Sequence, residues 1–229
     1  MTSRHPFRPV LALALAAAVW LAAMYAVRLV GVPQTNFLPP SFVTHSVMLA
    51  LSVAAMWLIS KGRLDLYGFT KGAYEFSPCI LLWVLPTAVL SIVSAVASPG
   101  GQGTGGPIKL TKPQMVVFIW VCASIGEETL TRGLLQTLLS RNARVGAEAH
   151  RRLSMPVLVS GLFFGSMHIV LVKLMGPAAV PVILLAVFLG LVAARYRERT
   201  RSLLPAIIVH ALFNIGGMLP LWVIQWLRG

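Results

Sequence analysis

The sequence predicts an all-α fold, a polytopic bundle of about seven membrane-spanning helices. Its composition is the first reason, because 57% of the residues are hydrophobic and only 11% are charged, whereas soluble domains average about 25% charged residues. The second reason is that apolar stretches recur along the chain at about the 20 residues that a helix needs to cross a hydrocarbon core of roughly 30 Å. No stretch between them is long enough for a soluble domain.

Seven apolar segments are expected to span the membrane, separated by linkers that carry glycine, proline and basic residues. These segments cover residues 9–30, 42–60, 77–98, 113–139, 154–174, 178–195 and 202–217. A turn at Gly176 and Pro177 should separate the fifth segment from the sixth. Residues 218–229 are too few to cross alone, so we expect an interfacial tail or a kinked extension of the seventh segment past Pro220.

The N-terminal segment has basic residues before an apolar core, as a signal peptide does. Its apolar run from Pro9 to Val27 is long for a signal core, so we expect a retained first span. Thirteen of the nineteen Lys and Arg residues fall on the side of the N-terminus, five fall on the other side, and Arg132 lies within a segment. The positive-inside rule therefore places the N-terminus in the cytoplasm. We expect an integral protein of a prokaryotic inner (plasma) membrane.

The net charge of +13 is explained by basic residues in the cytoplasmic loops and by the scarcity of Asp and Glu. No nucleic-acid partner is expected. The two cysteines, Cys79 and Cys122, lie in apolar runs without C-x-x-C spacing. Each is interpreted as a buried structural thiol.

A few strongly polar side chains fall inside the apolar segments. They are Glu127, Glu128 and Arg132 in the fourth segment, His168 in the fifth, and His210 with Asn214 in the seventh. At about 1.5 Å per residue, Glu128 and the polar residues of the fifth and seventh segments lie roughly 12–21 Å deep in a core of about 30 Å. Such groups are costly in lipid unless they are paired or face a cavity, and they mark function by default. Their common depth favours one shared site.

Helical spacing supports this interpretation. Glu128 and Arg132 are four residues apart and can lie on one helix face, as can Phe164 and His168 and also His210 and Asn214. Gly161 and Gly165 form a small-x-x-x-small pair that would let the fifth segment approach a neighbour closely.

Structural alternatives remain for these groups, although Glu127 is the hardest to explain in this way, because Arg132 can neutralise one carboxylate more readily than two. Glu128 and Arg132 could be only a buried ion pair that holds helices in register. The histidines and Asn214 could be hydrogen-bonding groups between helices, and Phe164 could be packing.

This set of side chains suits the direct attack of water on a peptide carbonyl. A carboxylate in a cavity of low dielectric can act as general base with a histidine beside it. A second histidine and an amide can donate hydrogen bonds to the developing oxyanion. Zinc-dependent hydrolysis is the rival, with Glu127, His168 and His210 as ligands. The sequence has no H-E-x-x-H pattern, which makes the metal hypothesis weaker.

Three ordered motifs carry a resemblance to a known family. They are "EETLTR" at 127–132, "FGSMH" at 164–168 and "HALFN" at 210–214. They resemble the E-E-x-x-x-R, F-x-x-x-H and H-x-x-x-N motifs of the CAAX-protease and bacteriocin-processing family. The flanking stretches "RGLLQTLL" and "SLLPAIIVHALFN" are similar to those of the family as well.

The resemblance implies an intramembrane glutamic endopeptidase, similar to the Ras-converting CAAX protease, with its site in a conical cavity of helices. It implies that Glu127 activates water with His168, that His210 and Asn214 form an oxyanion hole, that Glu128 and Arg132 orient Glu127, and that Phe164 lines the substrate site. No metal and no cofactor are implied. One departure from the family is Thr131, where members often carry a bulkier apolar or aromatic residue before the arginine.

The chain then divides into N-terminal helices and linkers (1–112), the catalytic core (113–217) and the tail (218–229). The expected partner is a membrane-associated protein or peptide, and a CAAX-like tail, a peptide precursor and a C-terminal sorting signal all remain open. A non-catalytic immunity or scaffold protein is the main alternative from another class. A small transporter is disfavoured, because its polar groups should follow a pathway rather than cluster at one depth.

Overall fold

The computed structural model describes residues 7–30, 38–97, 110–140 and 153–228, and all regular elements in these ranges are helices. This confirms the all-α prediction. The longer helices are α1 (Phe7–Val30), α2 (Pro40–Ser60), α3 (Leu85–Ala97), α7 (Met155–Met167), α9 (Ala179–Thr200) and α10 (Leu204–Arg228). Short helices are η1 (Leu64–Tyr67), η2 (Pro78–Val84), η6 (His168–Leu171), α8 (Val172–Met175) and η7 (Gly176–Ala178).

The helix over residues 112–140 changes its winding along its length. It consists of α4 (Lys112–Gln114), the π-helical η3 (Met115–Ala123), α5 (Ser124–Glu128), the π-helical η4 (Thr129–Leu135) and α6 (Gln136–Ser140). It begins with a capping box in which Thr111 and Gln114 satisfy each other's backbone N–H groups. Both glutamates of α5 therefore lie between two π-helical segments, which are rare and often occur at functional sites.

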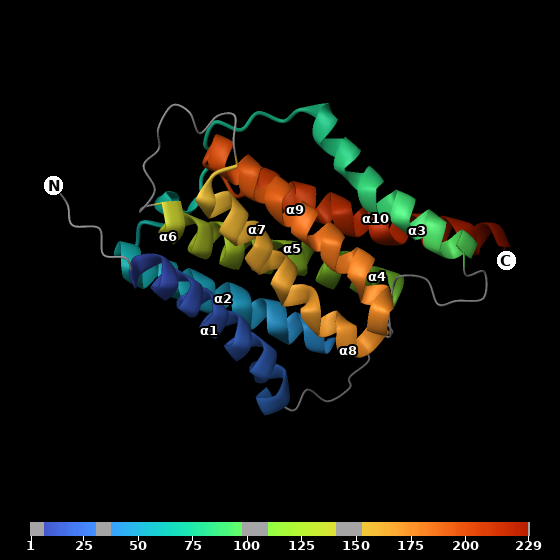
Figure 1. The fold of residues 1–229 in the computed structure, drawn as a ribbon, viewed down its shortest axis with the longest axis horizontal. Helices are drawn as coiled ribbons and strands as arrows, with labels where there is room; N and C mark the ends of the chain where they lie inside the picture. Colours follow the sequence, from blue (N-terminus) through green and yellow to red (C-terminus); the bar gives the residue numbers. More distant parts are fainter. Residues whose placement is uncertain (1–6, 31–37, 98–109, 141–152, 229) are drawn as a thin grey trace.

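This helix runs through the middle of the bundle (Figure 1). On one side α1 and α2 pack against each other and against η4, and on the other α10 packs against α3, α9 and α5. Two clusters of buried apolar side chains result. One joins α1, α2 and η4, and the other joins η2, α7, α9 and α10.

Helices α7 and α9 are in close backbone contact, as the glycine spacing predicts. A Cβ atom at Gly161 would lie 2.7 Å from Leu191 Cδ2, and one at Gly165 would lie 2.2 Å from Val187 Cγ2. On the facing helix, a Cβ at Gly190 would lie 2.6 Å from the carbonyl oxygen of Gly161. The chain reverses between the two helices at η7, where Gly176 has a φ of +59°. This confirms the expected turn.

Four helices are long and apolar enough to cross a membrane, judged by length and composition. They cover Pro9–Val30, Pro40–Ser60, Met155–Thr200 and Leu204–Ile224, and Pro78–Ser94 is a shorter apolar helix. Met155–Thr200 contains two of the expected segments, and the π-helical helix over residues 112–140 is not among the four. The count of about seven spans therefore stays a prediction.

Large apolar side chains remain exposed along the outer faces of these helices. Examples are Leu58 at 69%, Leu162 at 57% and Leu184 at 64% exposure. Such surfaces are unfavourable in water and favourable in hydrocarbon, so the helices support an integral membrane protein. Cys79, in the first turn of η2, is also exposed, so its interpretation as a buried thiol was wrong. Beyond Pro220 the chain continues as part of α10.

Candidate functional site

Glu128 and Arg132 form a fully buried ion pair on one helix face. The guanidinium Nη1 lies 3.1 Å from Glu128 Oε1, and both side chains are 0% exposed. Arg132 also donates through Nη2 to the carbonyl oxygen of Gly190 on α9, over 2.6 Å. The arginine thereby ties the central helix to α9 as well as neutralising Glu128.

Thr131 connects Glu127 to Arg132 through hydrogen bonds. Its hydroxyl donates to the carbonyl oxygen of Glu127 over 2.6 Å and accepts a hydrogen bond from Arg132 Nη1. Its own carbonyl oxygen accepts from the hydroxyl of Ser160 on α7, over 3.0 Å. The residue that departs from the family motif is thus a fully buried hydrogen-bonding group in this chain.

Glu127 has different neighbours from Glu128. Its carboxylate contacts two imidazoles: Oε1 lies 3.0 Å from His45 Nε2, and Oε2 lies 3.8 Å from His210 Nε2. Its side chain keeps 14% exposure. The two adjacent glutamates therefore divide between a sealed ion pair and an accessible carboxylate among histidines.

His210, on α10, connects both glutamates. Its Nδ1 lies 2.9 Å from Glu128 Oε1. An ionised carboxylate only accepts, so Nδ1 carries a hydrogen and Nε2 is the ring atom that faces Glu127. This assignment follows from the hydrogen-bond partners, as it must for histidine tautomers.

His168 opens η6 directly after the last residue of α7, rather than lying within a long straight span. Its Nδ1 lies 3.0 Å from the carbonyl oxygen of Phe164, one helical turn earlier. A carbonyl oxygen cannot donate, so Nδ1 carries the hydrogen and the neutral ring keeps a lone pair on Nε2. That lone pair is available to hold or accept a proton.

Phe164 is fully buried, and its ring contacts two imidazoles and the guanidinium group of Arg132. Its ring centroid lies 4.9 Å from that of His168 and 5.3 Å from that of His210, and Arg132 Cζ lies 4.7 Å from it. The aromatic ring thus contacts both histidine rings and shields the ion pair from the cavity.

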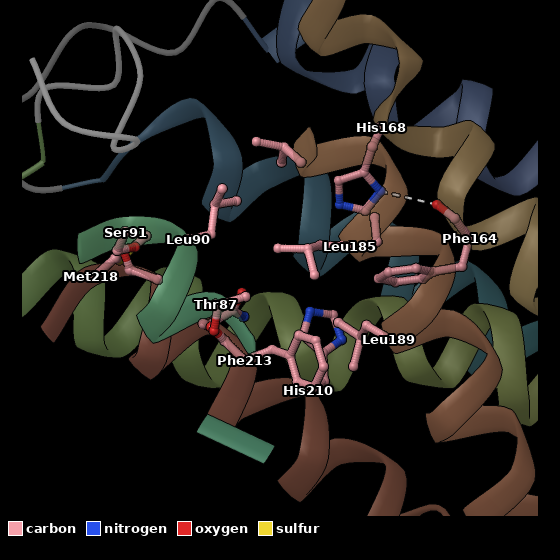
Figure 2. A pocket seen from close by; sticks show the side chains of 14 residues that line it. Thr87, Leu90, Ser91, Phe164, His168, Leu185, Leu189, His210, Phe213 and Met218 are labelled. Atoms are coloured by element: carbon pink, nitrogen blue, oxygen red, sulfur yellow. Dashed lines mark hydrogen bonds between the residues drawn. The ribbon is translucent and has the colours of Figure 1, made fainter. Parts of the chain in front are cut away.

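A cavity of about 160 Å³ opens beside these rings. Figure 2 shows His168 and His210 on two sides of it, with Phe164 in contact with both. The lining residues are Thr87, Leu90, Ser91, Phe164, His168, Val182, Leu185, Ala186, Leu189, His210, Phe213, Asn214, Gly217 and Met218. Most of this lining is apolar, and its polar residues are Thr87, Ser91, His168, His210 and Asn214.

Asn214 lines the cavity, but its amide is already engaged. Its Nδ2 donates to the carbonyl oxygen of Ile119 over 3.0 Å and to the hydroxyl of Ser124 over 3.2 Å. Both amide hydrogens are therefore used between α10 and the central helix. A role as oxyanion donor requires that one of these bonds give way to the substrate.

His45 is a member of this cluster that the sequence analysis missed. It lies in the second turn of α2, only three residues inside the expected second span. This position near the end of its segment suggests a residue at the membrane interface. No polar partner one helical turn away marks it as part of a site. A histidine within an otherwise apolar helix was the only available signal.

Among the residues that the structure describes, no group of three or more His, Cys, Asp or Glu side chains is arranged to hold a metal ion. Glu127, His168 and His210, the ligands of the zinc hypothesis, do not form such a group.

Part of the chain matches a known protein family. Residues 109–216 match the model of a protease family described as type II CAAX prenyl endopeptidase Rce1-like. No curated protein and no solved structure matches the chain. The matched region contains the three motifs and all the site residues predicted from sequence, whereas His45 lies outside it. The resemblance predicted from the motifs is thereby confirmed: residues 109–216 are similar to the Rce1-like CAAX endopeptidase family.

Proposed function

We propose that this protein is an intramembrane endopeptidase that hydrolyses a peptide bond of a membrane-associated substrate, with Glu127 as general base. The observation that carries the proposal is the division between the two glutamates. Glu128 is sealed and neutralised by Arg132, so it cannot take part in proton transfer without breaking the core. Glu127 is partly accessible and contacts imidazoles, which suits a group that exchanges protons.

The geometry of His210 supports a role as hydrogen-bond donor. Its Nδ1 lies 2.9 Å from Glu128 Oε1 and its Nε2 lies 3.8 Å from Glu127 Oε2. Carboxylates only accept hydrogen bonds, so we assign a hydrogen to each ring nitrogen, and the one on Nε2 can be donated to the substrate.

In the proposed reaction, a water molecule lies between Glu127 and the Nε2 lone pair of His168. Glu127 takes one proton from it while its oxygen bonds to the carbonyl carbon of the scissile peptide. The carbonyl oxygen becomes an oxyanion that accepts hydrogen bonds from His210 Nε2 and from Asn214. The C–N bond then breaks, and the proton on Glu127 passes to the leaving amine. Glu127 is thereby returned to its ionised form.

The apolar cavity lining supports a substrate that arrives with apolar side chains or a lipid-like tail. A CAAX-like tail, a peptide precursor and a C-terminal sorting signal all fit this description. We further propose that the site lies in a prokaryotic inner membrane with the N-terminus of the chain in the cytoplasm.

The test compares the termini of membrane proteins in cells that produce wild type with those in cells that produce Glu127→Gln at equal level. The substitution keeps the shape of the side chain and removes the base. Precursors that remain uncut only in the variant would support the proposal and identify the substrate. Identical termini at full coverage would contradict it and favour a non-catalytic scaffold. Loss of activity with a chelator and its return with zinc would replace the glutamate mechanism by the metal mechanism.

A further inference from the structure

His45 is held against Glu127 by the packing of α2 on the central helix. The imidazole is buried, with 9% exposure, and its Nε2 lies 3.0 Å from Glu127 Oε1. The two residues are separated by 82 positions in the sequence, and His45 lies outside the family match at 109–216. The contact therefore depends on how α2 docks.

Gly126, next to Glu127, makes this docking close. A Cβ atom at Gly126 would lie 3.0 Å from the carbonyl oxygen of His45 and 3.4 Å from its Cβ. The backbones of α2 and α5 thus approach each other at the level of the histidine. This close approach limits how far the imidazole can move relative to the carboxylate.

The ring can act only as a hydrogen-bond donor in this position. The ionised carboxylate accepts, so Nε2 carries the hydrogen. Nδ1 is buried, and nothing among the described residues pairs with it. His45 is therefore a fixed hydrogen-bond donor to Glu127.

We propose that His45 is a positioning residue for the general base. It holds Oε1 of Glu127, so that Oε2, which faces His210 Nε2, is the oxygen that takes the proton from water. Loss of the donor would let the carboxylate rotate and would slow the chemical step without changing substrate binding. This inference rests on the proposed endopeptidase function.

Two substitutions separate the hydrogen bond from the volume of the ring. His45→Phe keeps an aromatic ring and removes the donor. His45→Gln places an amide N–H near the position of Nε2 and keeps the donor. Met48→Ala is the matched control, because Met48 is buried (2% exposed) one turn further along α2 and carries no hydrogen-bonding group.

The assay measures kcat and KM for cleavage of a peptide spanning a site identified with wild type and Glu127→Gln, using full-length enzyme in lipid vesicles. We expect His45→Phe to lower kcat by roughly 10- to 100-fold, the range expected for a hydrogen bond to a charged group, with KM unchanged. His45→Gln should recover kcat to within about fivefold of wild type. Met48→Ala should lower thermal stability in detergent and keep kcat.

Several outcomes would overturn the inference. Wild-type kcat in His45→Phe, with Glu127→Gln inactive, would remove His45 from the mechanism and leave the proposed function intact. Equal loss in His45→Phe and His45→Gln would show that the donor alone is insufficient. An equal loss of kcat in Met48→Ala would assign the effect to α2 packing. Absence of cleavage by wild type on every membrane substrate would overturn the proposed function and this inference with it.

Discussion

Replacement of Arg132 by methionine should strongly destabilise the fold, because it leaves Glu128 as a buried anion without a cation. Both side chains are 0% exposed, so water cannot solvate the remaining charge. Removing one partner of a buried ion pair costs about 3–5 kcal/mol of unfolding free energy. The hydrogen bond to Gly190 is lost as well, but this cost belongs to the same cluster and is not simply added.

The double variant Glu128→Gln/Arg132→Met tests the cause of this loss. If the uncompensated charge dominates, removing both charges should recover at least about 2 kcal/mol relative to the sum of the single variants. Arg195→Met is the matched control, since Arg195 pairs with Glu198 on α9 and these side chains keep 17% and 27% exposure. That pair is expected to contribute only about 1 kcal/mol or less.

The measurement is a titration of the protein in mixed micelles with a denaturing detergent, followed by the loss of helical signal. The free energy of unfolding of each variant is compared with that of wild type. Strictly additive losses in the double variant would refute the argument from uncompensated charge. A loss for Arg132→Met no larger than that for Arg195→Met would refute the assignment of the pair as a sealed core element.

The site and its packing give three more expected outcomes. Glu127→Gln should abolish cleavage, yet change the free energy of unfolding by about 1 kcal/mol or less, because the amide oxygen can still accept from His45; a melt together with the cleavage assay checks both. Gly165→Ala should destabilise the protein by about 1–3 kcal/mol, because the added Cβ would lie 2.2 Å from Val187 Cγ2. Gly176→Ala is the comparison: no atom lies within 4 Å of the added Cβ, so this variant tests the positive φ of a turn glycine without a steric clash. Treatment with a strong chelator should leave cleavage unchanged, and loss of cleavage that zinc restores would contradict the glutamate mechanism.

Local spacing predicted those parts of the site that a single helix determines. Glu128 and Arg132, four residues apart, form the expected pair, and Phe164 and His168, also four apart, are joined by a hydrogen bond and a ring contact. The glycines of α7 make the expected close contact with α9. In each of these cases the geometry of the α-helix fixes which positions share a face, so sequence spacing is enough.

Contacts between distant segments were not accessible in this way. Asn214 shares a helix with His210, but its amide is engaged by Ile119 and Ser124, residues at least 90 positions away. His45 reaches Glu127 only because α2 docks closely at Gly126. The interpretation of the central helix as one regular span also missed its π-helical segments, which no simple periodicity predicts.

The adjacency of the two glutamates explains why they take different roles. Successive residues on a helix point about 100° apart, so Glu127 and Glu128 face largely different partners, although His210 contacts both. Glu128 points to Arg132 and to His210 Nδ1. The Oε1 atom of Glu127 instead contacts His45 on α2. Arg132 thus pairs with Glu128, and the ion-pair partners of Glu127 among the described residues are histidines. In the proposed mechanism, a tandem pair of acids beside one arginine is thus a compact way to place a base in an apolar bundle, because the ion-paired Glu128 fixes the helix that carries Glu127.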